Sequence, residues 1–495
     1  MGGTLYMPID LNSRFAKLLD VGLLQRELPA WLLGKRWFGA KSSTIASVKI
    51  LDWAAFSDSS GILFVLVHYA EDEPDTYQIP LLLSQDGQDK QSLLLCDAVD
   101  DEDFRQSLLR MVHDDASHPV ADRGTLQGRR STLFATLRGN ESLSARVSSA
   151  EQSNTNILFG DRMILKLFRR LQPGENPDVE IGRFLTDVAH FPHIPRILGE
   201  ITLSRPGAEP TSCAMLKELV RNEGDGWQWT LAALAHETEA ATPDPTAYLE
   251  AVALLGRRTA EMHLALATET SDEAFRAEPL TAIAITEEIR RIREQLHRAL
   301  EALQRLLPSL NDDAAKDAAT VLSRRESLLE KAERIVTYSP SGKRIRIHGD
   351  YHLGQVLRTK DDFVLLDFEG EPARSLVERR RKQNPLKDVA GMLRSFSYAA
   401  WVGLEHHTTV RPRSGPSPEE WQQAVSTSFL AAYRETVGAR PDLLPDEPLA
   451  ASLLNAYLLE KASYELLYEL NNRPDWVRIP LAGLMAMSEP DAPAG

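Results

Sequence analysis

The hydrophobic pattern of this chain changes near residue 220, and the change limits the folds that the chain can adopt. Before that point, short apolar runs such as IASVKILDW and ILFVLVHY end at acidic, glycine or proline residues. After it, apolar residues recur every three or four positions over long segments such as AYLEAVALLGRRTAEMHLALA. Short β-like runs predict strands, and the longer period predicts helices. We therefore expect an α+β protein with strands in its N-terminal part and helices in its C-terminal part.

The same patterns divide the chain into three segments. Residues 1–125 combine a short helical pattern, Leu11 to Leu24, with β-like runs, and predict a small α+β module at the N-terminus. Residues 126–220 continue with strands, including a hairpin at Gly160-Asp161 and a helix that begins near Asp178. Residues 221–495 are mostly helical, and two long patterns separated by PSLN predict an antiparallel pair of helices.

Charge and cysteine content narrow the range of partners. The 71 acidic and 56 basic side chains give a net charge of -15, which disfavours nucleic acid and anionic membrane surfaces. The two cysteines, Cys96 and Cys213, cannot build a disulfide framework and lack the spacing of a zinc site. We find no signal peptide and no run near the roughly 18 apolar residues of a membrane span, so we expect a cytoplasmic protein.

The stretch RIRIHGDYHLGQVL, Arg344 to Leu357, carries the polar residues best suited to chemistry. His348 and His352 would share a helix face, but RIRIH alternates as a strand, and no further ligand spacing supports zinc. Asp350, Gln355 and Asp367 instead lie at or just beyond the ends of strand-like runs, where their oxygen atoms can meet. An orienting carboxylate and hard oxygen ligands for Mg²⁺ suit phosphoryl transfer.

HGDYHLGQVL followed by LLDFEG resembles the HGDxHxxN…D signature of the aminoglycoside-phosphotransferase-like kinases, relatives of the protein kinases. The resemblance implies a bilobal protein-kinase-like fold in which an N-terminal cap module precedes a β-rich small lobe and a mostly helical C-lobe. It also implies Asp350 as the catalytic base, and Gln355 and Asp367 as Mg²⁺ ligands. The broad family usually has asparagine at the position of Gln355, and glutamine supplies the same amide oxygen on a longer stem.

Three further residues near this signature are expected to hold the catalytic loop. Asp388 matches a family aspartate that braces the loop, so we class it as structural. His348 is also expected to be structural, through hydrogen bonds of its ring nitrogens. His352 is expected to rigidify the loop in the same way, and it is also included among the residues near the acceptor.

A kinase must also hold ATP, and the small lobe offers candidates. Lys166 lies on the strand-like run RMILKLF, from which a lysine can reach phosphates, and Glu180 follows fourteen residues later as its predicted partner. Most pairs of this kind are surface charges of little energetic value. A polar turn stands where a glycine-rich loop would be expected, and its backbone amides can bind an anion. The residues of this turn are Ser153, Asn154 and Thr155.

The segment MLKELV lies where the two lobes should join, and we predict that the backbone of Glu218 and Val220 contacts adenine. An ordinary buried strand is the alternative.

The stretch LEKASYELLYELNNRPDWVRIPL is the best candidate for the acceptor site. At helical spacing its polar and aromatic residues form one stripe, and leucines form the opposite one. Such a stripe is usually a solvated face, but aromatic rings combined with charged groups also suit sugar hydroxyls. The predicted acceptor residues are Lys461, Tyr464, Glu465, Tyr468 and Glu469, followed by Arg473 and Trp476.

The same stretch resembles the EKAxYExxYExxNRPxW region of maltokinases and bacterial glucosamine kinases, and KRWFGAKS resembles the maltokinase group. The resemblance implies ATP-dependent phosphorylation of maltose to maltose 1-phosphate, which feeds α-glucan (glycogen) synthesis from trehalose-derived maltose. Binding to a trehalose synthase stays open. Two alternatives also stay open: a kinase for glucosamine or another amino sugar, and a catalytically silent regulator that binds sugar or nucleotide.

Overall fold

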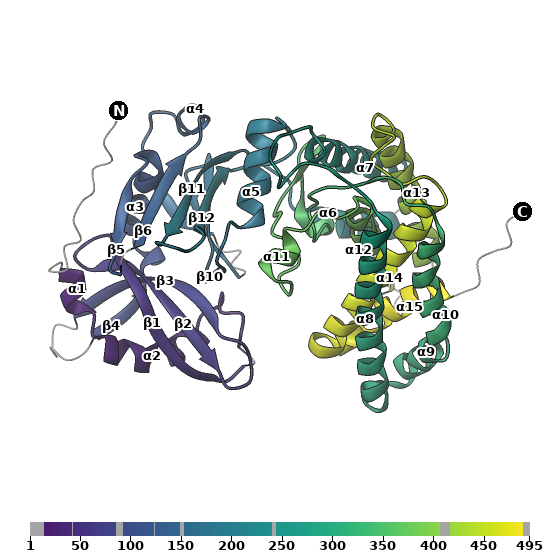
Figure 1. The fold of residues 1–495 in the computed structure, drawn as a ribbon, viewed down its shortest axis with the longest axis horizontal. Coiled ribbons are helices and arrows are strands. Elements are labelled where there is room, and N and C mark those ends of the chain that lie inside the picture. The colour runs from purple at the N-terminus through teal and green to yellow at the C-terminus, as the bar shows by residue number, and fades with distance from the viewer. Residues whose placement is uncertain are drawn as a thin grey trace, which may run out of the picture. The chain divides into compact units, whose positions relative to one another are not determined.

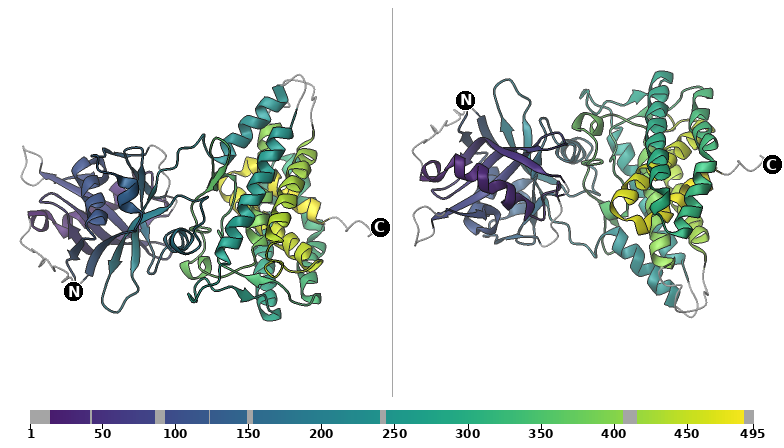
Figure 2. Two further views of the ribbon diagram at one scale, coloured as in Figure 1. Left: turned by 90° about the horizontal axis from the view of Figure 1, so that it is seen from above. Right: turned by 90° about the horizontal axis from the view of Figure 1, so that it is seen from below.

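The structure is a computed structural model that describes residues 14–41, 43–85, 93–122, 124–148, 153–239, 244–405 and 416–488. The chain forms two compact units. The first contains Met1–Thr186 and Pro195–Val220, and the second contains Asp187–Ile194 and Arg221–Gly495. The strand-rich purple and blue segments of Figures 1 and 2 belong to the first unit, and the mostly helical green and yellow segments belong to the second.

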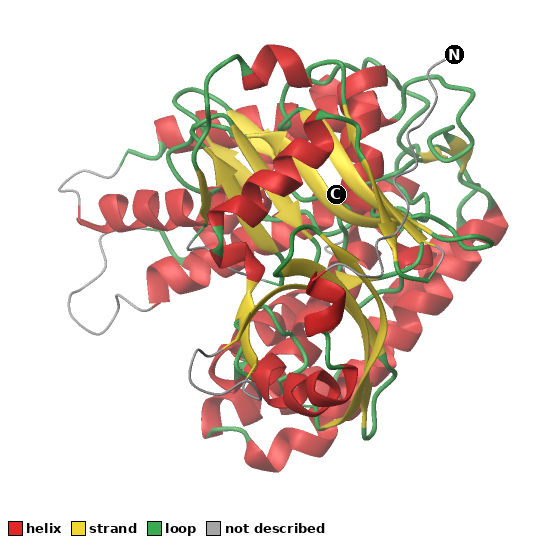
Figure 3. Ribbon diagram, turned by 90° about the vertical axis from the view of Figure 1, so that its left-hand side faces the viewer, coloured by secondary structure: helices red, strands yellow, loops and turns green. Residues whose placement is uncertain are grey.

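Within the described residues, the first unit contains two antiparallel sheets (Figure 3). The five-stranded sheet has the order β1-β2-β3-β10, and β4 also pairs with β3. Its strands are β1 (Ile45–Ala55), β2 (Ser60–Tyr69), β3 (Asp75–Gln85), β4 (Leu93–Asp97) and β10 (Arg170–Leu171). The helical pattern predicted near the N-terminus forms α1 (Arg14–Leu18) and α2 (Val21–Leu33), and Leu11 lies outside the described residues. Leu24, Leu28 and Leu32 of α2 join the core of this sheet.

The seven-stranded sheet has the order β5-β6-β11-β12-β9-β8-β7. Its strands are β5 (Ser117–Val120), β6 (Gly124–Arg130), β7 (Ala145–Val147), β8 (Thr155–Phe159), β9 (Met163–Leu167), β11 (Ile197–Ser204) and β12 (Thr211–Glu218). Helix α3 (Glu102–His113) packs against β6, and α4 (Phe134–Arg138) follows that strand. The predicted boundary after residue 125 falls inside β6, and β10 pairs with β3. The two N-terminal segments are therefore interleaved.

Two local predictions in this unit can be compared with the backbone. The hairpin at Gly160 is present, because β8 pairs with β9 and Gly160 has a φ of 57°, which glycine adopts without strain. Its connection has three residues, since Phe159 pairs with Met163. The helix predicted to begin near Asp178 is α5 (Pro177–Arg183), and the side chain of Asn176, not that of Asp178, caps it by accepting from the Asp178 amide.

The second unit is built mainly from helices, several of which pack against α14 and α12. They are α6 (Gly226–Glu239), α7 (Thr246–Leu266), α8 (Ala282–Leu306), α9 (Asp312–Ser323), α10 (Arg325–Glu333), α11 (Leu376–Arg379), α12 (Leu386–Glu405), α13 (Pro418–Val437), α14 (Leu449–Asn472) and α15 (Arg478–Ser488). The predicted helical pair is formed by α8 with α9 and α10. None of the helices in the described part of the chain combines the length and apolarity that crossing a membrane requires.

Two short antiparallel strand pairs frame the polar loop of this unit. β13 (Glu278–Pro279) pairs with β14 (Lys343–Arg344), and β15 (Val356–Arg358) pairs with β16 (Phe363–Leu365). The predicted strand RIRIH is therefore short, and it continues only as a bridge between Ile345 and Gln383. The loop between β14 and β15 carries the residues that sequence singled out.

Candidate active site

Asp388 on α12 holds the loop between β14 and β15 in place. Its Oδ2 accepts from the amide of His348 at 2.8 Å, and its Oδ1 accepts from the amide of Gly349 at 2.9 Å. The Nε2 atom of His263 on α7 lies 3.0 Å from Oδ2. Burial raises the pKa of Asp388, but hydrogen bonding from His263 and the Gly349 amide outweighs burial and lowers the pKa. An ionised, buried carboxylate thus braces the loop, as the resemblance implied.

Both histidines of the loop use their rings for local hydrogen bonds. The ring of His348 is buried; its Nε2 donates to the carbonyl of Leu366 at 2.7 Å, and its Nδ1 accepts from the amide of Asp350 at 3.4 Å. The Nδ1 atom of His352 accepts from the amide of Gly354 at 3.0 Å. Burial lowers the pKa of His352, which favours the neutral ring. These bonds rigidify the turn on which Asp350 lies.

The β15–β16 hairpin brings Gln355 and Asp367 together. The Leu366 amide donates to the Gln355 carbonyl at 2.9 Å, and the side-chain Nε2 of Gln355 lies 3.4 Å from Oδ2 of Asp367. Turning the amide by 180° would place its oxygen beside that carboxylate, as two ligands of one cation require. A carboxylate oxygen of Glu369 lies within 4.8 Å of one of Asp367. This oxygen-rich donor set fits Mg²⁺.

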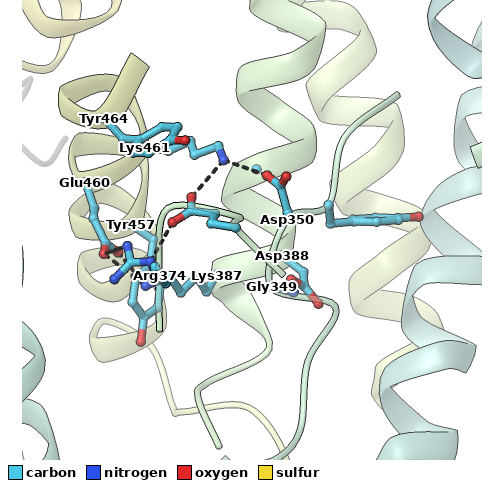
Figure 4. A pocket seen from close by; sticks show the side chains of 12 residues that line it. Gly349, Asp350, Arg374, Lys387, Asp388, Tyr457, Glu460, Lys461 and Tyr464 are labelled. Carbon is cyan, nitrogen blue, oxygen red and sulfur yellow. Dashed lines mark hydrogen bonds and ion pairs between the residues drawn. The ribbon is translucent and has the colours of Figure 1, made fainter. Parts of the chain in front are cut away.

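Beside Asp350 the structure contains a cleft whose labelled residues come from the loop, from the segment before α11, and from α12 and α14 (Figure 4). Lys461 on α14 donates to Oδ1 of Asp350 at 3.0 Å and to Oε1 of Glu371 at 2.9 Å. Burial alone would lower the pKa of Lys461, but the two carboxylates outweigh it and raise the pKa well above its ordinary value. The residues that line the cleft are Gly349, Asp350, Tyr351, Glu371, Arg374, Lys387, Asp388, Gly391, Tyr457, Glu460, Lys461 and Tyr464.

Glu371 begins a chain of ion pairs that sequence reasoning missed. Arg374 donates to Glu371 at 2.5 Å and to Glu460 at 2.9 Å, and Lys387 donates to Glu460 at 3.0 Å. Burial raises the pKa of Glu371, but Lys461, Arg374 and Lys387 outweigh it and lower the pKa to about 2. The charged residues in DFEGEPARS, directly after Asp367, were the available signal for Glu371 and Arg374.

The predicted acceptor stripe divides into two parts in the structure. Lys461 and Tyr464 line the cleft, and the Lys461 ammonium lies 5.0 Å from the centre of the Tyr464 ring. The carboxylate of Glu465 accepts from Arg394 on α12 at 2.6 Å, and Glu469 is buried. Of the described residues lining the cleft, none is Glu465, Glu469 or His352. Glu465 is bonded to Arg394, and Glu469 is bonded to Arg473 and Tyr398. Contact of these three residues with the acceptor stays a prediction.

The end of the stripe forms a partly exposed group of rings around Arg473. The Arg473 guanidinium lies 5.1 Å from the ring centre of Tyr468 and 4.6 Å from that of Trp476. Arg473 also pairs with Glu469 at 2.8 Å, and Glu469 accepts from the hydroxyl of Tyr398 at 3.1 Å. The 45% exposed Tyr468 keeps an open ring face at this end of α14.

In the first unit, Lys166 lies on β9 and its ammonium donates to Asp178 at 3.2 Å. Lys217 on β12 donates to the same carboxylate at 3.3 Å. The predicted partner was Glu180, which lies buried two residues further along α5. Lys166 is therefore bonded to the first turn of α5 at Asp178. Its pairing with Glu180 stays a prediction.

The remaining nucleotide candidates lie at strand ends. Ser153 is exposed and Asn154 half-buried, directly before β8. Thr155 is fully buried, and its hydroxyl accepts from Arg169 at 2.8 Å, so this side chain faces the core. Glu218 ends β12, and its carboxylate pairs with Arg196 at 2.7 Å. Val220 is the last residue of the first unit.

Comparison with known proteins places these residues in a family. Residues 144–411 match the phosphotransferase enzyme family, and this span includes Asp350, Gln355, Asp367 and Asp388. The chain belongs to this family. Residues 31–108 match the maltokinase N-terminal cap domain, which confirms the predicted resemblance to maltokinases.

The chain is also similar to curated and solved kinases. It is 28% identical over 333 residues to a glucosamine kinase of Streptacidiphilus jiangxiensis, covering 67% of this chain and 70% of that protein. It is 27% identical over 350 residues to a glucosamine kinase of Mycolicibacterium smegmatis, covering 69% and 79%.

A solved glucosamine kinase in complex with glucosamine, ADP and inorganic phosphate has a TM-score of 0.67 at 22% identity, covering 95% of this chain and 99% of that one. A second crystal form of glucosamine kinase has a TM-score of 0.69 at 21% identity, with the same coverage. These likenesses confirm the predicted kinase-like fold with a strand-rich N-terminal part and a helical C-terminal part.

Proposed function

We propose that this protein transfers the γ-phosphoryl group of ATP to a hydroxyl of a sugar. The observation that carries the proposal is the braced loop, which presents Asp350 in a cleft and ends at the Gln355–Asp367 pair. Asp350 would orient the acceptor hydroxyl and accept its proton. Gln355 and Asp367, joined by Glu369, would hold Mg²⁺. When bound, this ion would neutralise charge that develops on the transferred phosphoryl group.

The nucleotide is assigned to the first unit. Lys166 would contact the ATP phosphates, and Asp178 and Glu180 of α5 supply the carboxylates that orient it. Backbone amides near Ser153, Asn154 and Thr155 would contact phosphate oxygens. The backbone of Glu218 and Val220, at the end of β12, would contact adenine.

Maltose is the proposed acceptor, and maltose 1-phosphate the proposed product. The match to the maltokinase cap domain supports this choice. Charge in the cleft supports it as well, because each lining carboxylate already has a partner: Lys461 for Asp350 and Glu371, Arg374 and Lys387 for Glu460, and His263 for Asp388. A neutral sugar needs no further countercharge there. Tyr464 supplies a ring face at the cleft, and Tyr468 on α14 and Trp476 just after it would supply further faces for a second sugar ring.

The product would serve as a donor for α-glucan synthesis from trehalose-derived maltose in the cytoplasm. A trehalose synthase is the proposed partner. Glucosamine is the second candidate acceptor, since the two curated relatives carry the name glucosamine kinase.

The test is a product assay with the purified full chain, ATP and Mg²⁺, and either maltose or glucosamine. Phosphorus NMR separates an acid-labile anomeric phosphate from a stable 6-phosphate ester. We expect the anomeric product with maltose and little turnover of glucosamine. A 6-phosphate ester formed from glucosamine alone would make the second candidate correct. Folded protein that consumes no ATP with any sugar would overturn the kinase proposal and favour a silent binding protein.

A further inference from the structure

Lys461 reaches the catalytic loop from a distant part of the chain. It lies on α14, 111 residues after Asp350, and it bridges the carboxylates of Asp350 and Glu371. Figure 4 shows its side chain extending to Asp350 from the opposite wall of the cleft. The family match ends at residue 411, so Lys461 lies outside the span that this chain shares with the family model.

We infer that Lys461 is the positioning residue for Asp350, and that Glu371 and Arg374 fix Lys461 in turn. The inference rests on the proposed function, and it changes the role expected for Lys461 from a sugar contact to a support for the base. It also assigns a role to Glu371, which the sequence did not single out.

The first argument is that the two carboxylate oxygens of Asp350 differ in their hydrogen bonds. Lys461 holds Oδ1, and none of the described residues donates a hydrogen bond to Oδ2. When one oxygen of a carboxylate is held, the orientation of the whole group is fixed. The other oxygen then points in a defined direction and can accept a hydrogen bond from a substrate hydroxyl. Phosphoryl transfer depends mainly on positioning of this kind, because its loose transition state makes limited demands on base strength.

The second argument is that Lys461 is itself held by two contacts besides the one with Asp350. A free lysine side chain has large conformational entropy and would be a poor guide for another residue. Here Glu371 accepts from it at 2.9 Å, the ring of Tyr464 lies 5.0 Å away, and Arg374 anchors Glu371. The Glu371 side chain is only 5% exposed, so the anchor has little freedom.

The third argument is energetic. Buried ion pairs add little net stability, since the loss of hydration offsets their attraction, and apolar residues of similar volume often replace them without loss. A chain of such pairs that runs from Glu460 through Arg374, Glu371 and Lys461 to Asp350 needs another reason to be kept. Support of the base is a reason that the geometry supplies.

The experiment compares kcat and KM of the full chain with those of Lys461→Met. We expect kcat to fall about 100-fold, as misplacement of a reacting group by about 1 Å can cause. KM for ATP and for sugar should each stay within about threefold of the wild type. Lys316→Met, an exposed substitution on α9, is the matched control and should leave both constants unchanged.

Restoring the ammonium is the second readout. Lys461→Cys alkylated with 2-bromoethylamine recreates a lysine-like side chain and should recover at least a tenth of wild-type kcat, whereas alkylation with iodoacetamide should not. Wild-type protein treated with each reagent controls for Cys96 and Cys213. A role confined to packing would give equal results with both reagents and would overturn the inference.

Glu371→Gln tests the anchor. It keeps the size of the side chain, and we expect kcat to fall about 10-fold with little change in KM, and Lys461→Met/Glu371→Gln to lose no more than Lys461→Met alone. Should Lys461→Met fail to fold, Glu371→Gln decides: unchanged kcat overturns the inference. A folded Lys461→Met with normal kcat, or with only a raised KM for sugar, also overturns it. An inactive wild type instead overturns the proposed function.

Discussion

Two groups of paired charges, one in each unit, differ in how far their side chains are exposed. In the first unit, Arg169 is fully buried and donates to Asp97 at 2.8 Å and to Thr155 at 2.8 Å. In the second unit, Lys461 bridges Asp350 and Glu371. The Arg169 side chain has no exposed surface, whereas the side chains of Lys461 and Asp350 are 19% and 21% exposed and line a cleft.

The Arg169 group, which includes Asp97 and Thr155, connects the two sheets of the first unit. Asp97 ends β4 of the five-stranded sheet, and Thr155 begins β8 of the seven-stranded sheet. The Arg169 guanidinium also lies 4.4 Å from the ring centre of Trp37, in the core beside α2. Burial of charge therefore does not mark an active site by itself. A charged group that is held on one side and open to a cleft on the other is the better criterion.

Asp350→Asn should produce the largest effect and would sharpen this comparison. The amide keeps the size of the side chain but cannot accept the hydroxyl proton, so kcat should fall by about 10²–10⁴-fold. Steady-state kinetics together with a thermal melt would measure activity and folding in the same sample. Asp361→Asn, an exposed change in the neighbouring β15–β16 turn, is the control. Near-normal turnover by folded Asp350→Asn would remove Asp350 from the proposed mechanism.

Arg169→Met should lower the stability of the protein and leave its kcat nearly unchanged. It leaves the Asp97 carboxylate buried without its cation, which costs about 3–5 kcal/mol in the free energy of unfolding. Urea denaturation of the full chain would measure this loss. The kcat of the folded protein should stay within about threefold of the wild type. Arg170→Met breaks the half-exposed pair with Asp75 and should cost less than about 1 kcal/mol. If both variants cost the same, burial is not what distinguishes the Arg169 group.

The grouping of Asp350, Gln355 and Asp367 could be predicted from sequence because these residues are close along the chain. Asp350, Gln355 and Asp367 lie within eighteen residues, and a single hairpin brings the last two together. The partners of the side chains on α14 could not be predicted in this way. Helical periodicity places Lys461 and Glu465 on one face, but it does not reveal which partner each side chain meets. Glu465 meets Arg394, and only the packing of α12 against α14 determines this.

The fold shows the same limit. Short β-like runs such as IASVKILDW and ILFVLVHY located β1 and β2, because that signal is local. Membership of a sheet is a tertiary property, and β10, with two residues, carries too little pattern to reveal that it pairs with β3. The predicted boundary at residue 125 consequently fell inside β6. The junction at residue 220 was easier to find, since strand-like sequence gives way there to helical sequence.

Gly391→Ala should have a smaller effect, and it should lower both kcat and stability. An added Cβ would lie 2.5 Å from the carbonyl oxygen of Tyr351, next to Asp350, so α12 or the loop must move. We expect about 1–3 kcal/mol of destabilisation and a roughly 10-fold lower kcat. Gly22→Ala on α2 meets only ordinary contacts and should be neutral or slightly stabilising. Unchanged kcat with lost stability would show that the loop tolerates the displacement.

The last effect is a dependence of stability on pH, and it tests whether the ion pairs of Glu371 at the cleft contribute to the free energy of unfolding. The pKa of Glu371 is lowered from its ordinary value of 4.5 to about 2, so the folded state favours the charged form. Its stabilising contribution is present above pH 4.5 and is lost as the pH falls towards 2. The difference in unfolding free energy between wild type and Glu371→Gln should therefore shrink by about 2 kcal/mol from pH 6 to pH 3. Urea titrations at several pH values would measure it. A difference that stays constant over this range would mean that Lys461 and Arg374 hold Glu371 no more strongly than solvent does.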